Sequence, residues 1–315
     1  MARPLSATAK RVLKELTPSL STRAFGLAEL LIGEANSEDV SLVSPETLAQ
    51  MVNAAAACLS AQSGTKSQIR VETGEHDETI VVAVNKNMPF LFDSILGEIN
   101  SSGIDARLVV HPVADVHHDA QGFEIDDGIR RTVGGGSGVK TSIVACVLEP
   151  ASADKRDALE VGMKATIAQV KAAVAGWKPM LERIGQAVDE LQTGVLPAKK
   201  SDVAEAIAFL DWLRSDNFTF LGMRDYDFVG GQARGKLQRG DTKGLGILAD
   251  PDFRILRRGN EAFTTTPQIR AFLNSRDVLI VTKANTKSLV HRRAYLDYIG
   301  VKQFTGQLSL GVVSL

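Results

Sequence analysis

The spacing of hydrophobic residues changes near residue 74, and this change separates regions of different predicted structure. Up to residue 73, leucines recur at three- and four-residue spacings, which is the period of an amphipathic helix. Ser44 and Pro45 are typical of a helix start, and the helix that they open is expected to end near Gly64. We therefore predict a helical region over residues 1–73.

From Thr79 the pattern becomes one of strands and helices. Residues 79–84 form a β-branched run of strand length. Pro89 is expected to open a helix that ends at Gly103. Two more strands are expected at 107–116 and 141–148, followed by a long helix from Ala153. This order supplies five of the six elements of a ferredoxin-like βαββαβ unit, in which helices cover one face of an antiparallel sheet.

A linker-like stretch at residues 197–200 precedes a third region with its own helix and strands. The expected elements are a helix at 202–214 and strands at 218–221, 226–229 and 278–281. The predicted fold class is therefore α+β, with a helical segment, βαββαβ-like units and a long helical connection. The predicted domains are residues 1–73, 74–200 and 201–315.

Apolar residues repeat in a heptad pattern along the long helix. Pro179 interrupts the pattern, so we expect a kink or two successive helices there. The repeat has two interpretations: packing within one domain, or a contact between subunits that would make a homo-oligomer. The residues of this seam are Val170, Val174, Trp177, Leu181, Ile184 and Val188.

Composition narrows the class of protein. A chain of 315 residues with 44% hydrophobic residues can fold into two or three domains. The net charge of -1 gives no general electrostatic case for binding nucleic acid or an anionic membrane. No apolar run approaches the roughly 18 residues of a membrane span, and the N-terminus lacks the apolar core of a secretion signal. We expect a cytoplasmic protein with no nucleic-acid or membrane partner.

The candidate chemical motifs are weak. Residues 230–236 lack the Ser or Thr that follows the lysine of a phosphate-binding loop, so a hairpin turn is expected. Residues 134–138 lack the glycine spacing of a dinucleotide loop. Adjacent histidines at 117 and 118 would point to opposite faces of a strand. Cys58 and Cys146 are expected to be buried and inert. We therefore predict no cofactor site, no metal site and no catalytic residue in this segment.

Four blocks of residues carry a resemblance to a known family. They are 84–94 with 108–113, 210–222, 244–248, and 282–302. In this order they resemble the N-terminal region of the large bacterial NAD-specific glutamate dehydrogenases. The apolar residues 308–315 also favour a fragment of a longer protein, because natural termini are usually polar.

The resemblance implies a function. In this family, small βαββαβ modules of the ACT type precede a dehydrogenase domain that lies far downstream and uses NAD. The segment is then expected to be a non-catalytic regulatory and assembly region. The full-length protein would convert L-glutamate, with NAD, to 2-oxoglutarate and ammonium. The expected partners are the downstream domain of the same chain, an amino-acid effector and further copies of the chain.

A regulatory ligand would be expected at the turn between the first strand and first helix of the ACT-like unit. Backbone N–H groups at a helix N-terminus favour a carboxylate. The side chains of Asn85 and Asn87 can both donate and accept hydrogen bonds, Met88 completes the turn, and Asp93 can pair with an ammonium group. The alternative is that these residues merely cap the turn and the helix.

Two other functions are kept open. One is a purely architectural module that buries the heptad seam between subunits. The other is a self-contained enzyme with a site between residues 74–200 and 201–315, for which the titratable candidates are Asp93, His111, Lys283 and His291.

Overall fold

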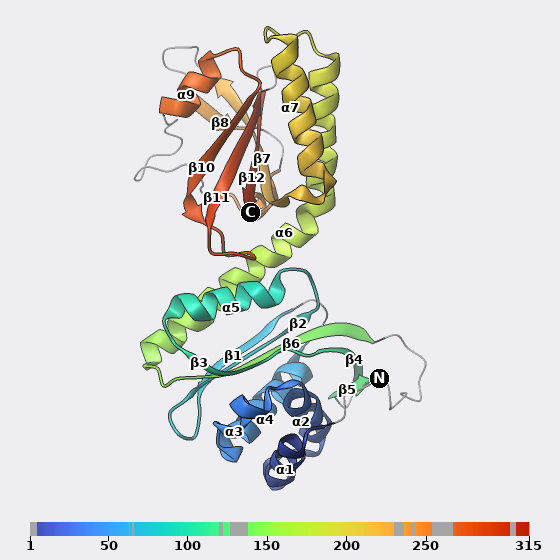
Figure 1. The fold of residues 1–315 in the computed structure, drawn as a ribbon, viewed down its shortest axis with the longest axis vertical. Helices are drawn as coiled ribbons and strands as arrows, with labels where there is room; N and C mark the ends of the chain where they lie inside the picture. The colour runs from blue at the N-terminus through green and yellow to red at the C-terminus, as the bar shows by residue number, and fades with distance from the viewer. Residues whose placement is uncertain are drawn as a thin grey trace. The chain divides into compact units, whose positions relative to one another are not determined.

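The computed structural model describes residues 5–62, 64, 66–119, 122–126, 138–229, 236–240, 243–253, 267–302 and 307–314 (Figure 1). The chain forms two compact units, residues 1–167 and 168–315, and each is described by itself. The α+β class is confirmed. The domain boundaries drawn after residues 73 and 200 stay a prediction.

Unit 1 begins with a layer of short helices. Four side chains, Ser6, Ser21, Asn36 and Ser44, each accept a hydrogen bond from a backbone N–H of the helix that follows, which satisfies a group that the helix leaves without a partner. The elements are α1 (Ala7–Leu16), η1 (Thr17–Ser19), α2 (Thr22–Glu34), α3 (Ser37–Ser41) and α4 (Pro45–Ala61).

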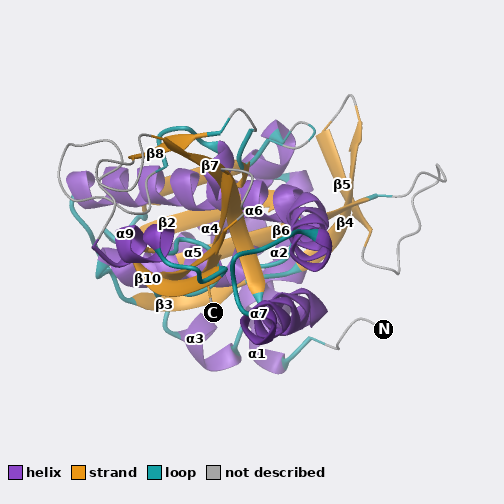
Figure 2. Ribbon diagram, turned by 90° about the horizontal axis from the view of Figure 1, so that it is seen from above, coloured by secondary structure: helices purple, strands orange, loops and turns teal. Residues whose placement is uncertain are grey.

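An antiparallel sheet follows this helical layer. Its strands are β1 (Gln68–Thr73), β2 (Thr79–Lys86), β3 (Ala106–Val110), β4 (Val113–Asp119), β5 (Gly122–Asp126) and β6 (Val139–Leu148), and its helices are α5 (Leu91–Ser102) and α6 (Ala153–Thr193). The order is β1-β2-β6-β4-β5, with β3 also paired to β6, and Figure 2 shows β4 and β5 as a hairpin. The edge place beside β2 is thus filled by β1, which precedes it in the chain.

Helices cover both faces of this sheet, which corrects the expectation of one covered face. Ile80 and Val82 of β2 point into the core with α1–α4, whereas Val81 points into the core with Ile95 of α5 and Met163 of α6. The reason is the period of two along a strand, which sends alternate apolar residues to opposite faces. A strand that is apolar at every position, such as β2, is therefore buried on both sides.

Three local predictions for unit 1 were wrong. Residues 68–73 form a strand instead of a helix. The strand predicted at 107–116 is two strands, because His111-Pro112 interrupts it. Helix α5 starts at Leu91, since Phe90 adopts a left-handed φ of 65° and the helix cannot include it.

Unit 2 holds a second antiparallel sheet and its helices. The helices are α6 from residue 168 onward, α7 (Lys200–Trp212), the π-helical turn η2 (Leu213–Asn217), η3 (Ile247–Ala249) and α9 (Pro267–Asn274). The strands are β7 (Thr219–Val229), β8 (Lys236–Arg239), β9 (Leu245–Gly246), β10 (Leu279–Lys287), β11 (Tyr295–Lys302) and β12 (Gln307–Ser314). The order is β10-β11-β12-β7-β8, with β9 also paired to β7.

Two expectations for unit 2 are corrected. The strands predicted at 218–221 and 226–229 are one strand, β7. Helix α6 continues through Pro179 as a single element, so two successive helices do not form. The hairpin predicted around 230–236 agrees with the antiparallel pairing of β7 and β8, although residues 230–235 lie outside the described residues.

The core of unit 2 lies between its helices and one face of its sheet. Met180, Ile184 and Val188 of α6 pack there with α7 and with Phe220 and Ile299 of the sheet. At Gly176, helix α6 lies close to the backbone of Gly246. A Cβ on Gly176 would be only 2.5 Å from the backbone nitrogen of Gly246. Among the described helices of the whole chain, none is long and apolar enough to cross a membrane.

Candidate functional site

The first candidate site is the junction between β2 and α5, where the sequence placed a regulatory ligand. Asn85 lies within β2 and is 1% exposed, so it is not part of the turn. Its side-chain oxygen accepts from Ser67 Oγ at 2.8 Å, and its amide donates to the backbone oxygen of Lys86 at 2.6 Å. Asn85 therefore connects the residue before β1 to the end of β2.

The other three residues of this candidate site lie nearer the helix. Asn87 is exposed, and its backbone N–H donates to the oxygen of Lys140 at 2.8 Å. Met88 packs against the core beneath α5, and Asp93 is exposed in the first turn of α5. The residue at the N-cap of this helix, Phe90, makes no side-chain capping hydrogen bond.

His111 lies close to this junction. Its ring stacks on Phe92 with centroids 4.2 Å apart, and its Nε2 lies 2.7 Å from Ser142 Oγ. Burial lowers the pKa of His111 below its ordinary value, while the charges of Asp93 and Glu34 oppose that shift. The enzyme hypothesis had named His111 and Asp93, and the fold brings these two into electrostatic contact. The other two candidates, Lys283 and His291, belong to unit 2.

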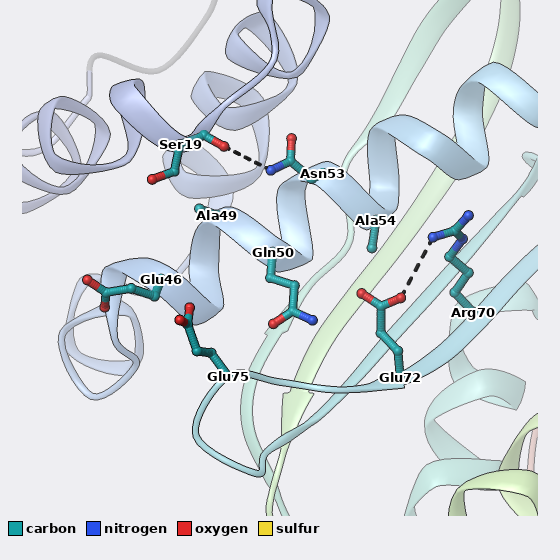
Figure 3. A pocket seen from close by; sticks show the side chains of 9 residues that line it. All are labelled: Ser19, Glu46, Ala49, Gln50, Asn53, Ala54, Arg70, Glu72 and Glu75. Atoms are coloured by element: carbon teal, nitrogen blue, oxygen red, sulfur yellow. Dashed lines mark hydrogen bonds and ion pairs between the residues drawn. The ribbon is translucent and has the colours of Figure 1, made fainter.

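A polar pocket on unit 1 is a second candidate, and the sequence did not point to it. It has a volume of about 360 Å³ and lies between α4 and the β1–β2 hairpin (Figure 3). Its lining residues are Ser19, Glu46, Ala49, Gln50, Asn53, Ala54, Arg70, Glu72 and Glu75. Four of them are charged, and they come from segments that only the tertiary fold brings together.

A buried carboxylate holds the turn beside this pocket. Glu78 is 4% exposed, and its Oε2 accepts from Thr47 Oγ1 and from the backbone N–H of His76, each at 3.2 Å. Arg107 lies 3.9 Å from its Oε1 and also forms a bidentate pair with Glu149 at 2.7 and 2.6 Å. The turn that carries Glu75 is thus attached both to α4 and to β3.

The seam residues occupy different environments within unit 2. Ile184 and Val188 are buried in its core, and Leu181 packs against that core. Val170 is fully buried, whereas Val174 and Trp177 are half-buried. A subunit contact through the seam would have to use Val174 and Trp177, because Val170 is buried and the other three residues pack in the core of unit 2.

The cysteines and histidines suggest no reactive or metal centre. Burial raises the pKa of Cys58 to about 11 and that of Cys146 to about 12, which keeps both thiols protonated. His118 Nε2 lies 2.9 Å from the backbone oxygen of Leu59. Among the described residues no three His, Cys, Asp or Glu side chains converge on a metal position. Residues 134–137 lie outside the described residues.

Comparison with known proteins shows which proteins this chain is similar to. Residues 27–162 match the model of the glutamate dehydrogenase ACT1 domain. The chain is also 26% identical over 241 residues to the NAD-specific glutamate dehydrogenase of Halomonas elongata, and 25% identical over 232 residues to that of Pseudomonas aeruginosa. Each match covers 73% of this chain but only 14% of the relative.

Proposed function

Because the chain carries the ACT1 domain of glutamate dehydrogenases and resembles NAD-specific members of that family, we propose that it is a non-catalytic regulatory and assembly region of such an enzyme. The match over residues 27–162 carries this proposal. The antiparallel sheet with α5 and α6 on one face supports it, because that arrangement is typical of ACT-type modules.

The whole protein's activity belongs to the same proposal. The full-length chain would oxidise L-glutamate to 2-oxoglutarate and ammonium with NAD, and its dehydrogenase domain would be the main partner of this region. The proposed location is the cytoplasm. NAD would bind in the dehydrogenase domain, and residues of this segment would change its activity only through the conformations that they favour.

The proposed effector is an amino acid at the β2–α5 junction. The N-terminus of α5 favours a carboxylate, and Asp93 in its first turn can pair with an ammonium group. Asn87 is exposed beside them, whereas Asn85 would act indirectly by fixing the end of β2. Met88 would supply an apolar contact.

Enzyme assays and calorimetry test this function. We expect the chain alone to reduce no NAD when L-glutamate is added, with the Pseudomonas aeruginosa relative as a positive control. Turnover above background would refute the non-catalytic assignment.

Titration with neutral amino acids should give saturable binding that Asn87→Ala weakens about tenfold, the loss expected for one hydrogen bond to a charged group. Asn100→Ala, on the last turn of α5, is the matched control and should bind normally.

A further inference from the structure

The polar pocket between α4 and the β1–β2 hairpin has the size of a small-ligand site. Ala49 and Ala54 form part of its wall, and their short side chains leave space where α4 passes the hairpin. Its volume of about 360 Å³ falls within the range of pockets that hold small molecules. The chemistry of the lining then decides which small molecule fits.

Two amides present hydrogen-bond acceptors to this space. The Nε2 group of Gln50 donates to the backbone oxygen of Thr73 at 3.0 Å, and the Nδ2 group of Asn53 donates to that of Ser19 at 3.1 Å. Each amino group thus has one hydrogen bonded to the backbone, and each amide oxygen can accept. A ligand with N–H donors complements these two oxygens.

The charges of the pocket are separated along its length. Figure 3 shows Arg70 and Glu72 at one end and Glu46 and Glu75 at the other, with Gln50 between them. Arg70 and Glu72 are 3.7 Å apart, which is a weak pair with donors of Arg70 remaining. Within the described residues, Glu46 and Glu75 form no ion pair. The complementary ligand is therefore mainly cationic, with an anionic group near Arg70.

A divalent metal does not meet this description. Metal ions require several oxygen ligands that converge on one point. Three carboxylates line the pocket, yet the described residues contain no group of three acidic or histidine side chains able to hold a metal. Carboxylates at separate positions are better matched by an organic ligand whose positive groups are also separated.

We propose that this pocket binds a free diamino acid. The carboxylate of the ligand contacts the guanidinium of Arg70, and its two ammonium groups contact Glu72 at one end and Glu46 and Glu75 at the other. The amide oxygens of Gln50 and Asn53 accept the remaining ammonium hydrogens. The site shares no residue with the β2–α5 junction, so it is independent of the effector site proposed there.

Three related compounds test the two kinds of contact. L-Lysine carries all three charged groups, L-norleucine lacks the second ammonium, and 1,5-diaminopentane lacks the carboxylate. Isothermal titration calorimetry with the whole chain should show saturable binding of L-lysine. Each of the other two should bind about tenfold more weakly, because each loses one charge-assisted contact. Equal affinities for the three compounds would overturn the proposal, as would no binding of L-lysine at 10 mM.

Side-chain substitutions locate the binding. Glu46→Gln and Glu75→Gln should each weaken L-lysine binding about tenfold. Glu38→Gln is the matched control, because Glu38 also lies in the first turn of a helix but is not part of the pocket. Arg70→Met should weaken L-lysine binding without weakening that of 1,5-diaminopentane. An equal effect of Glu38→Gln would overturn the assignment to this pocket.

The outcome separates this site from the effector site at the junction. L-Lysine binding that is weakened in Glu75→Gln and kept in Asn87→Ala supports the pocket, whatever happens with neutral amino acids. L-Lysine binding that is lost only in Asn87→Ala refutes it. Far-ultraviolet circular dichroism verifies that each variant is folded, which is expected because Glu46, Arg70 and Glu75 are exposed.

Discussion

At the scale of single residues, His111 links the protonation of one side chain to the stability of unit 1. Its ring is half-buried, stacked on Phe92 and hydrogen-bonded to Ser142. Burial lowers its pKa from the ordinary 6.5, so the folded state favours the neutral ring. The unfolded chain then binds more protons below about pH 6.5.

The contribution of His111 to stability is therefore complete above its unfolded pKa and is lost as the pH falls. We expect the melting temperature to decrease between pH 7 and pH 5, and His111→Gln should reduce that decrease, because glutamine can bond to Ser142 without titrating. Thermal unfolding followed by circular dichroism measures this effect. His76→Gln, which replaces an exposed histidine of the same unit, is the control for the substitution itself. An equal pH dependence in wild type and His111→Gln would contradict the prediction.

Single residues also show why the sequence predicted the β2–α5 junction but not the polar pocket. Asn87 and Asp93 are adjacent in the chain to the turn that they serve, so local pattern was enough to select them. The pocket was missed because Glu46 and Arg70 come from different elements, and each alone is typical of an exposed surface. Only the packing of α4 on the β1–β2 hairpin brings Glu46 and Arg70 to the same pocket.

At the scale of elements, glycine decides how closely α6 approaches the sheet of unit 2. Gly246 has a φ of 58°, and a Cβ there would lie 2.1 Å from the backbone oxygen of Leu221. Gly176 of α6 lies against the backbone of Gly246. A side chain at Gly176 would push the helix away from β9, and a side chain at Gly246 would collide with the backbone of β7.

We expect Gly176→Ala to destabilise unit 2 by about 1–3 kcal/mol, because overpacking outweighs the better helix propensity of alanine. Gly26→Ala is the matched control: it is also within a helix, and its Cβ would have nothing within 4 Å. That control should stabilise the protein by up to about 1 kcal/mol. Urea unfolding gives both values, and a stabilising Gly176→Ala would show that the close approach is not required.

Elements were predictable where burial produced a clear period. The buried strands β2 and β6 and the capped helix α4 agree with their predicted positions. Strand β1 was not found, because Arg70 and Glu72 interrupt its apolar positions and it lies at an edge. The break between β3 and β4 follows from Pro112, which was visible in the sequence. The unbroken path of α6 past Pro179 depends on tertiary packing, which a local pattern does not contain.

At the scale of the whole molecule, the apolar seam of α6 allows the proposed role in assembly to be tested. Ile184 lies in the core of unit 2, whereas Val174 is half-buried on the same helix. A substitution at Ile184 should therefore affect folding, whereas a substitution at Val174 should affect association between subunits.

We expect Val174→Asp to convert a dimer or larger oligomer to monomer while the fold is retained. Ile184→Asp should instead destabilise unit 2 by several kcal/mol, since it places a charge in an apolar core. Sedimentation velocity measures association, and thermal unfolding measures stability. A wild-type protein that stays monomeric at high concentration would rule out a subunit contact through the seam.

The position of β1 has a consequence for synthesis on the ribosome. In a βαββαβ unit the edge strand beside the first strand is the last to emerge, after the second helix. Here that place is filled by β1, whose partner β2 follows after a short turn, so the contact is local in sequence. The sheet of unit 1 is complete once Leu148 has been synthesised. We expect this sheet to pack on α1–α4 first, while the chain is still being synthesised. The opposite face is then covered completely only after α6 has left the exit tunnel.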